Sequence, residues 1–412
     1  MSAEVTGPQV AVVGGSLGGL TAACVLGDIG CDVHVYERSR APLVGRGAGI
    51  VVHPASVRYL VEASVGALEQ TTAPARWVRY LDPDGGVAHE EPCAYRFTSY
   101  YALYRDLLSC LPSDRYHLDH ELIGFSQGAG HVAARLAGRG SRRCDLLVCA
   151  DGINSTARRL LLPEAGRRYA GYVAWRGTVV EVELTRRTFD ALHEAITYFV
   201  MPHSHMLAYP IPSVDGSVGP GRRLTNWVWY RNVAGGGALD ELMTDRDGVL
   251  RDVSMPPGAS KQRHVRELRR AAQQSLPPSL AELVSKTSSP FVQVVFDIEV
   301  PQMAFGRACL IGDAAFVLRP HAAVGTAKAA DDAWKLAEAV AACDFDIPAA
   351  LQLWEPGRLE LGRRVLRRTR EAGQRSQLEN SWRVGDPLPF GLYTPGDSSL
   401  PEDWAKRPHA TA

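Results

Sequence analysis

Two features near the start of this sequence could together hold one phosphate-containing ligand. Residues 10–19 (VAVVGGSLGG) are an apolar run that leads into a glycine-rich turn. Such a turn between a strand and a helix presents unpaired backbone N–H groups to a pyrophosphate at the helix N-terminus. Glu37 ends the next apolar run, close to the roughly 20-residue spacing of a carboxylate that binds a ribose hydroxyl. The two features predict a site for the ADP half of a dinucleotide.

The turn and its surroundings supply the candidates for contact with that nucleotide, which are Gly14, Ser16, Leu17, Gly19, Glu37 and Arg38. Ser16 stands where the usual G-x-G-x-x-G pattern has its middle glycine, so the backbone approaches a pyrophosphate less freely. A small hydroxyl can itself donate to a phosphate oxygen. We therefore expect dinucleotide binding to survive this change.

Two later stretches place an acidic residue beside a glycine. Residues 149–158 contain Asp151 followed by Gly152, and residues 309–315 contain Gly312 followed by Asp313. Together with the glycine-rich turn, these pairs resemble the motifs of the flavoprotein aromatic hydroxylases, the single-component FAD monooxygenases typified by p-hydroxybenzoate hydroxylase. The resemblance implies FAD as the cofactor, with Asp313 at its ribityl chain. The chain has a single dinucleotide fingerprint, so the resemblance also implies that NADH or NADPH binds only transiently, as a co-substrate.

The likeness extends to family members that act on hydroxypyridines, through residues 49–52, 96–100, 170–177, 208–212 and 319–323. It covers nearly the whole chain up to about residue 364. By this resemblance, further FAD contacts come from Gly49, Ile50, Val51, Arg105, Pro320, Val324, Gly325 and Thr326. The chain departs from the common pattern near the flavin at Phe316, Ala323 and Ala327, which alters local contacts there.

The reaction that the resemblance implies sets a requirement on the substrate pocket. In this family NAD(P)H and O2 give a flavin C4a-hydroperoxide, which hydroxylates an electron-rich phenol or hydroxypyridine ring. Removing the proton of a ring hydroxyl makes the ring more nucleophilic, so we expect a base and hydrogen-bond acceptors nearby. The loop that carries His321 is expected on the substrate side of the flavin, and histidine titrates near working pH. His321 is thus the first catalytic candidate, although it could serve only to shape its loop.

Residues on the expected strands of the middle segment provide further candidates. His205 and Tyr209 could line the substrate pocket, but their direction depends on a strand register that the pattern leaves open. The aromatic residues Trp175, Trp227, Trp229 and Tyr230 are expected mainly in the core of a sheet, with stacking on an aromatic substrate as the alternative. The sequence offers no metal-ligating motif.

Two other function classes stay open at this point. The first is an FAD-dependent epoxidase or Baeyer–Villiger monooxygenase, whose pocket for an alkene or a ketone would not need a base such as His321. The second is a non-oxygenating flavin reductase. Use of oxygen, together with formation of a hydroxylated ring, would separate both from an aromatic hydroxylase.

The order of apolar patterns predicts an α/β chain. We expect a discontinuous Rossmann-like FAD-binding domain from residues 1–75, 102–168 and 297–345. It is interleaved with a mostly antiparallel β-sheet substrate domain from residues 76–101 and 169–296, rich in Val, Tyr and Trp, with strands expected at residues 196–201, 205–211 and 226–230. A long helix is expected over residues 326–343. Residues 346–412 form a C-terminal helix and a tail, which lies on the body or on a neighbouring subunit or is disordered.

Composition excludes some classes of partner. Lys and Arg together number 45, as do Asp and Glu, so the 412-residue chain has no general attraction to nucleic acid or anionic membranes. Its eight cysteines show no C-x-x-C spacing, and no signal segment or membrane span is evident. We therefore expect a cytoplasmic protein without a membrane span. We also expect a homo-oligomer, a dimer or larger. The cysteines expected to pack as small hydrophobes are Cys24, Cys31, Cys144, Cys149 and Cys309.

Overall fold

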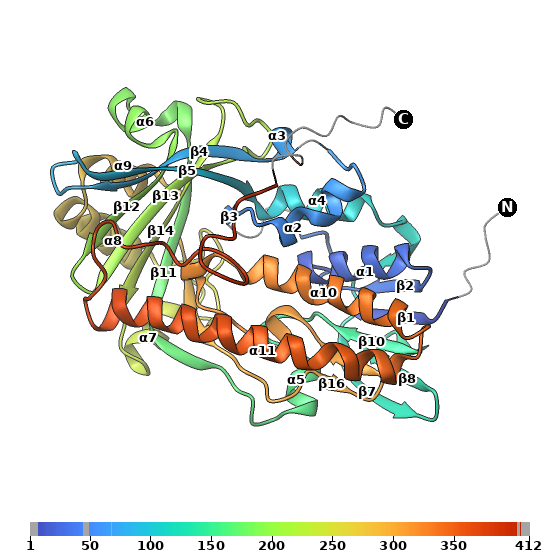
Figure 1. The fold of residues 1–412 in the computed structure, drawn as a ribbon. Coiled ribbons are helices and arrows are strands. Elements are labelled where there is room, and N and C mark those ends of the chain that lie inside the picture. Colours follow the sequence, from blue (N-terminus) through green and yellow to red (C-terminus); the bar gives the residue numbers. More distant parts are fainter. Residues whose placement is uncertain (1–6, 44–48, 67, 402–403, 405–412) are drawn as a thin grey trace.

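The computed structural model describes residues 7–43, 49–66, 68–401 and 404. A six-stranded sheet contains the N-terminal strand, and only its edge strand β16 runs antiparallel to its neighbour (Figure 1). In spatial order its strands are β16 (Ala304–Phe305), β17 (Ala308–Leu310), β10 (Leu146–Cys149), β1 (Gln9–Val13), β2 (Asp32–Tyr36) and β6 (Tyr116–His117). The carboxyl ends of β1, β10 and β17 therefore bring the three predicted dinucleotide motifs to one edge of this sheet.

Helices and a small sheet flank these strands. Helix α1 (Leu17–Asp28) follows the glycine-rich turn and packs beside α10 (Gly325–Ala342), close to the predicted helix over residues 326–343. The three-stranded sheet consists of β7 (Leu122–Gly128), β8 (His131–Leu136) and β9 (Gly140–Cys144). The shorter helices are α2 (Pro54–Glu62), α3 (Leu68–Thr71), α4 (Tyr100–Ser109), α5 (Thr156–Leu161), α6 (Arg186–Leu192) and α7 (Gly237–Met243).

An eight-stranded sheet forms the other half of the molecule. In spatial order it contains β15 (Phe291–Asp297), β11 (Arg168–Val180), β14 (Leu224–Asn232), β13 (Ser204–Ile211), β12 (Ala195–Met201), β4 (Ala73–Leu81), β5 (Val87–Ser99) and β3 (Gly49–Val51). Its pairs are antiparallel except β12 with β4. Strand β3 and the start of β4 belong to the segment 1–75 yet pair within this sheet. The predicted α/β class, with a parallel and a mostly antiparallel sheet, is confirmed.

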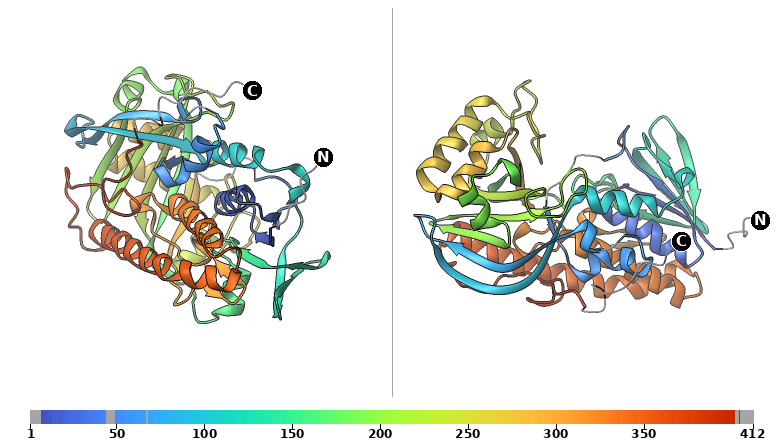
Figure 2. Two further views of the ribbon diagram at one scale, coloured as in Figure 1. Left: turned by 45° about the vertical axis from the view of Figure 1, so that its right-hand side comes forward. Right: turned by 90° about the horizontal axis from the view of Figure 1, so that it is seen from above.

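The eight-stranded sheet buries both of its faces. One face packs on α8 (Gln262–Ser275) and α9 (Pro278–Lys286), which cover it on the side away from α11 (Figure 2). The three tryptophans Trp175, Trp227 and Trp229 lie on this face, so they are sheet core as expected. The opposite face carries tyrosines and His205 and lies over a cavity.

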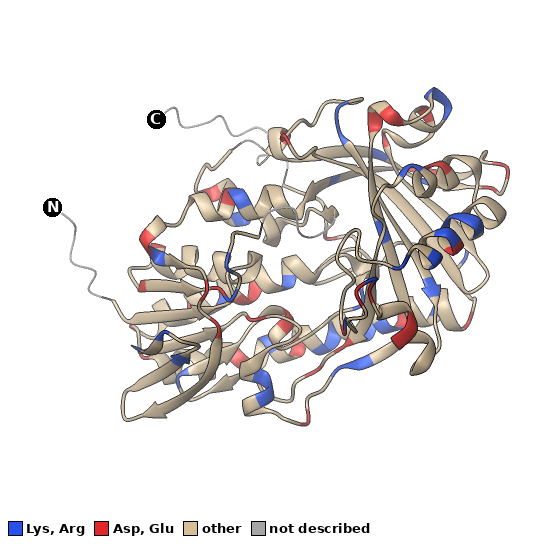
Figure 3. Cartoon of the chain, turned by 180° about the vertical axis from the view of Figure 1, so that it is seen from behind, with Lys and Arg blue, Asp and Glu red and all other residues tan. Residues whose placement is uncertain are grey.

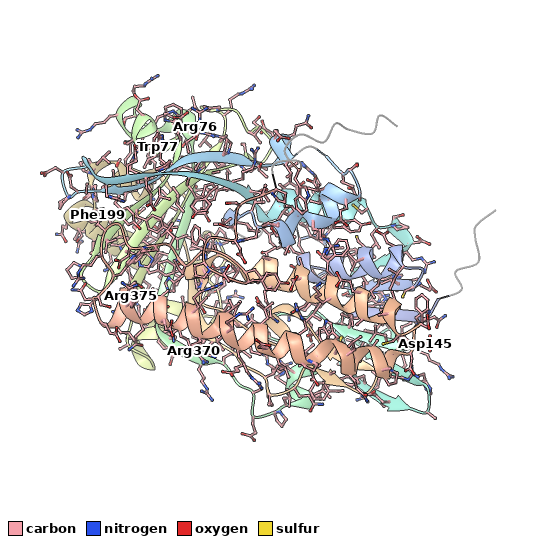
Figure 4. All side chains as sticks on the ribbon, viewed as in Figure 1. Arg76, Trp77, Asp145, Phe199, Arg370 and Arg375 are labelled. Atoms are coloured by element: carbon pink, nitrogen blue, oxygen red, sulfur yellow. The ribbon has the colours of Figure 1, made fainter. Side chains whose placement is uncertain are left out.

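The chain ends in a long helix and an extended segment. Helix α11 (Ile347–Gly373) runs beside α10 and continues into a π-helical turn, Gln374–Leu378; Figure 4 labels Arg370 and Arg375 near this end. Residues 379–398 then lie on the body of the molecule. They are anchored where Arg375 bonds Asp386 and where the Tyr393 hydroxyl donates to Asp331 over 2.7 Å. For residues 379–398 of the tail, packing on the body, one of the alternatives that the sequence left open, is observed.

Surface and cysteine properties follow the composition. Basic and acidic residues are interspersed over the view in Figure 3. The eight cysteines are free thiols, and the five named above are buried, which confirms that they pack as small hydrophobes. Within the part of the chain that the structure describes, no helix has the length and apolarity needed to cross a bilayer.

Candidate active site

The glycine-rich turn is held against the ends of two strands. Gly14 has a φ of 100°, and a Cβ atom there would lie 2.3 Å from the carbonyl oxygen of Ala150, so only glycine fits. Glu37 accepts the N–H of Gly15 over 2.8 Å through one carboxylate oxygen and that of Ser39 over 2.9 Å through the other. The carboxylate thus joins the turn to the end of β2 and lines the adjacent cavity.

Some residues of the turn line cavities, and others pack against neighbouring protein atoms. Ser16 and Leu17 line the cavities at the N-terminus of α1, and the Ser16 hydroxyl lies 2.8 Å from that of Tyr100. Gly19, in the first turn of α1, instead packs against the glycine-rich turn, because a Cβ there would lie 1.8 Å from the carbonyl oxygen of Gly14. The first-turn N–H groups of α1 therefore remain available to an anion.

The two predicted acidic residues line the cavity at this helix end. Asp151 accepts the N–H of Thr156 over 2.8 Å through Oδ2, whereas its Oδ1 is buried with no partner among the described residues. The side chain of Asp313 lies deep in the molecule but is exposed to the cavities. Burial raises the pKa of both carboxyl groups. Each oxygen without a partner fits a hydroxyl donor such as that of a ribose or ribityl chain.

Three cavities run in series past Asp313. The first, of about 270 Å³, is lined by Gly14, Glu37, Arg38 and Asp151, and it shares Ser16 and Asp313 with the second, of about 380 Å³. The second shares Gly49, Ile50, Gly325 and Thr326 with the third, of about 370 Å³, which is also lined by Val51, Pro320 and Val324. This elongated space fits an extended dinucleotide with a ring system at the Gly325 end. Arg105 is not among the residues that line these three cavities, and its side chain pairs with Asp106 over 2.8 Å.

The sheet register determines which residues reach the third cavity. His205 pairs with Tyr230, and Leu207 with Val228, on neighbouring strands. Because side chains alternate along a strand, His205, Leu207 and Tyr209 share one face, and all three line the cavity. The register that the sequence left open therefore places both His205 and Tyr209 in the pocket wall.

Two imidazoles meet at this cavity, with ring centroids 5.5 Å apart. The Nε2 atom of His321 lies 2.7 Å from the Tyr172 hydroxyl, and the Nδ1 atom of His205 lies 3.0 Å from the Gln377 amide nitrogen. In the described part of the chain, no group hydrogen-bonds the second nitrogen of either ring. Both rings line the cavity, so each can offer that nitrogen to a bound molecule.

The environment keeps both imidazoles neutral. Burial and the guanidinium of Arg319 lower the pKa of His321 to about 3, although the nearby Asp297 carboxylate opposes the shift. Burial and the neighbouring His321 lower the pKa of His205 well below its ordinary value. Arg319 is itself fixed by two hydrogen bonds to Asp297, of 3.0 and 2.8 Å. At neutral pH each ring is therefore a hydrogen-bonding group without charge.

The Tyr209 hydroxyl has a partner in the protein. It donates to the carbonyl oxygen of Gly49 over 2.9 Å, while the Gly49 N–H donates to Asn226 Oδ1 over 3.2 Å. The ring of Tyr209 also stacks on Phe97 with centroids 4.4 Å apart. Tyr209 and Asn226 thus fix β3 beside the cavity.

Comparisons with known proteins agree with this geometry. A family model described as FAD binding domain-like matches residues 169–297. The 2,6-dihydroxypyridine 3-monooxygenase of Paenarthrobacter nicotinovorans is 40% identical over 389 residues, which cover 94% of this chain and 96% of that protein. This chain belongs to the FAD-dependent aromatic hydroxylases.

Further matches support the same family assignment. The solved structure of 2,6-dihydroxypyridine-3-hydroxylase from Arthrobacter nicotinovorans matches it with a TM-score of 0.89 at 38% identity, covering 96% of this chain and 99% of that one. The 3-amino-4-hydroxybenzoate 2-monooxygenase PtmB3 of Streptomyces platensis is 29% identical, covering 90% of this chain and 89% of that protein. The family, the aromatic hydroxylase class and the FAD cofactor with NAD(P)H as co-substrate, all expected from the motifs, are confirmed.

The structure adds residues to the hydroxylase site that sequence reasoning missed. Arg176, within a segment quoted for its likeness, lines the second and third cavities, and its Nε has no partner among the described residues. Tyr172, in the same quoted segment, bonds His321. The tail contributes Trp382, Leu388 and Phe390 to the third cavity. Its Pro- and Gly-rich composition gave no signal for such a role.

One glycine near the end of α11 protects the Tyr172–His321 contact. A Cβ atom on Gly373 would lie 2.3 Å from the Tyr172 hydroxyl oxygen and 3.0 Å from His321 Nε2. Larger residues at this position would push the helix away from both rings. The helix can therefore close the cavity only with glycine here.

Proposed function

We propose that this hydroxylase acts on a small hydroxypyridine or phenol bound in the third cavity. The observation that carries the proposal is the pair of neutral imidazoles that line this cavity, each with one ring nitrogen hydrogen-bonded by the protein and the other without a partner among the described residues. FAD, reduced by NADH or NADPH, supplies an electrophilic oxygen derived from O2. An alkene would bond neither imidazole and a ketone oxygen would bond only one of them, so epoxidation and Baeyer–Villiger chemistry are not favoured.

In this proposal the two histidines take different roles. His321 donates through Nε2 to Tyr172, and its Nδ1 accepts the hydrogen of a ring hydroxyl. Accepting this hydrogen bond shifts negative charge onto the ring oxygen and raises the electron density of the ring at the carbon that is hydroxylated. His205 contacts a second ring oxygen, since the 5.5 Å between the imidazole centroids suits two oxygens on one six-membered ring. The relative at 40% identity is named for a ring with two hydroxyls.

The residues that hold FAD are assigned from the cavities that they line. We propose that Glu37 and Arg38 contact the adenosine end of FAD and that the N-terminus of α1 binds the pyrophosphate. Asp151 and Asp313 would accept hydrogen bonds from hydroxyls of the ribose or ribityl chain. The flavin ring would lie among the remaining predicted contacts, Gly49, Ile50, Val51, Pro320, Val324, Gly325 and Thr326. Gly14 shapes the turn, and Gly19 packs it against the helix. Arg105, which pairs with Asp106, stays a predicted contact of FAD.

A substrate panel tests the proposed function. Purified protein with bound FAD is mixed with NADH or NADPH and a series of hydroxypyridines and phenols, and oxygen uptake, peroxide and hydroxylated product are recorded together. We expect 2,6-dihydroxypyridine or a close analogue to stimulate NAD(P)H oxidation, with one product formed per oxygen consumed. Oxidation that no ring stimulates would contradict the proposal and favour the other flavin chemistries.

Two properties expected from the sequence stay predictions. We propose a homo-oligomer located in the cytoplasm, in keeping with free buried cysteines. Sedimentation of the FAD-bound protein measures its assembly, and fractionation of the source cells measures its location. A monomer at micromolar concentration would contradict the first prediction.

A further inference from the structure

The π-helical turn after α11 places an amide against a histidine of the substrate cavity. Gln377 is fully buried, and its Nε2 lies 3.0 Å from Nδ1 of His205. The turn is fixed because the backbone oxygen of Gln377 accepts a hydrogen bond from the Asn232 side chain over 2.8 Å. Strand β14 therefore holds Gln377 in place against strand β13.

This contact decides where His205 carries its proton. An amide NH2 group only donates, so the imidazole nitrogen that it contacts must present a lone pair. A neutral imidazole carries one N–H, so when Nδ1 accepts, the proton is on Nε2. Burial keeps the pKa of His205 far below its ordinary value, so the ring stays neutral. The Nε2–H group then has no partner in the described protein and can donate to a molecule in the cavity.

The same C-terminal segment holds the imidazole from its other side. The ring of Trp382 packs edge-on against His205 with centroids 4.6 Å apart, and against Tyr198 with centroids 5.6 Å apart. Trp382 lines the cavity together with Leu388 and Phe390. On the sheet side, the ring centroids of Tyr230 and His205 lie 4.6 Å apart. His205 is thus confined between β14 and the tail, with a single nitrogen left to the ligand.

We propose that Gln377 is a positioning residue that makes His205 a hydrogen-bond donor, so that the segment from Gln377 to Phe390 selects rings bearing an acceptor oxygen opposite His205. The inference rests on the proposed function, in which an aromatic ring occupies this cavity. The donor fits a carbonyl-like or deprotonated ring oxygen. A ring that carries one hydroxyl for His321 and one such oxygen for His205 matches both nitrogens.

Ring binding by the FAD-bound protein tests the proposal without requiring turnover. The probe is 2,6-dihydroxypyridine, followed by its perturbation of the flavin absorption, and phenol serves as the single-oxygen comparison. We expect Gln377→Leu to weaken binding of the dihydroxypyridine about tenfold, the size of one lost hydrogen bond. Gln377→Glu should weaken it more, because a carboxylate accepts and draws the imidazole proton to Nδ1. Phenol binding should change less than threefold in both variants.

A matched control separates this role from a merely structural one. Gln374 is exposed in the same turn, and Gln374→Leu should leave both ring affinities unchanged. In steady state, Gln377→Leu should raise KM for the dihydroxypyridine about tenfold and change kcat less than threefold. Equal affinities in the Gln377 and Gln374 variants would overturn the proposal. Wild-type protein that binds the ring without hydroxylating it would contradict the proposed function, and the affinities would still decide the inference.

A measurement on the unaltered protein covers variants that do not fold. Nitrogen-15 NMR of histidine-labelled holoenzyme reports which ring nitrogen is protonated, and the His205 signals are assigned by their loss in His205→Gln. We expect a neutral ring with its proton on Nε2. A proton on Nδ1 would show that Gln377 accepts rather than donates, and would overturn the assignment.

Discussion

The two faces of the eight-stranded sheet are both buried, yet they differ in chemistry. The face toward α8 and α9 carries Trp175, Trp227 and Trp229 among aliphatic residues, and the one polar group of Trp227 is satisfied within the core. The opposite face carries His205 and a series of tyrosines, and it meets the loop of His321. One face therefore stabilises the fold, and the other keeps unused hydrogen-bonding groups for a ligand.

This difference shows how adjacent positions on one strand serve separate purposes. Trp229 and Tyr230 are neighbours in sequence, but the first packs in the core and the second lines the cavity. The same alternation separates Met206 from His205. A substitution that destabilises the fold and one that impairs catalysis can thus lie one residue apart.

The largest effect is expected from His321→Ala on the cavity side. Hydroxylation should fall by about 10² to 10⁴, the usual loss when a proton-accepting group is removed. FAD content and flavin reduction by NAD(P)H should persist, because His321 contacts the ring cavity and not the nucleotide end. Product formation under saturating substrate measures the change, and His203→Ala, on an exposed turn, is the control. Unchanged hydroxylation would remove His321 from the mechanism.

On the core side, Trp227→Ala should act on stability. The side chain is fully buried, and its Nε1 donates to Thr287 over 2.8 Å. Removing it should lower the free energy of unfolding by about 3–5 kcal/mol, as measured by urea denaturation. Leu353→Ala, whose side chain is 61% exposed, should change it by less than about 0.5 kcal/mol. If folded Trp227→Ala protein hydroxylated with an altered ring preference, the two faces would not be separate.

Acid should destabilise the protein through the cavity face. His321 has a pKa near 3 in the folded state and about 6.5 when unfolded, so the unfolded chain binds more protons between these values. The stability that neutral His321 contributes is therefore fully present above about pH 6.5. It is lost as the pH falls toward 3, by at most about 1.4 kcal/mol per pH unit. Denaturation at several pH values should show a shallower loss for His321→Asn than for wild type. Parallel pH profiles of stability for the two proteins would contradict the lowered pKa of His321.

The smallest effect is expected from Tyr209→Phe. This change removes only the hydroxyl that donates to the Gly49 carbonyl and keeps the ring that stacks on Phe97. Stability should fall by about 0.5–1.5 kcal/mol, and hydroxylation should change less than tenfold. A hundredfold loss of kcat at normal FAD content would instead show that the hydroxyl contacts the substrate.

Much of the fold and of the nucleotide end was predictable because its signals are local. A strand, a glycine-rich turn and an acid at the end of the next strand follow one another in sequence, and the structure places Gly14, Ser16, Glu37 and Arg38 together. The strands of the second sheet were also recognised, since β12, β13 and β14 begin and end within about two residues of the predicted runs. Arg105 pairs with the neighbouring Asp106, and its predicted contact with FAD stays a prediction.

The ring site depended on tertiary contacts. His205 is held by Gln377, and His321 by Tyr172, each pair joining segments more than one hundred residues apart. The tail that supplies Trp382 carries no motif, so its place in the cavity wall is visible only after folding. Pairings between distant segments leave no periodic signal in either segment.

By itself, the sequence determined the α/β class, the FAD cofactor and the family, because strand periodicity and glycine motifs act within short stretches of chain. Only the tertiary structure decided which side of each strand faces the substrate, since a shift of one residue reverses every side chain. It also decided the protonation of His205 and His321, because burial and partners from remote segments set their pKa values.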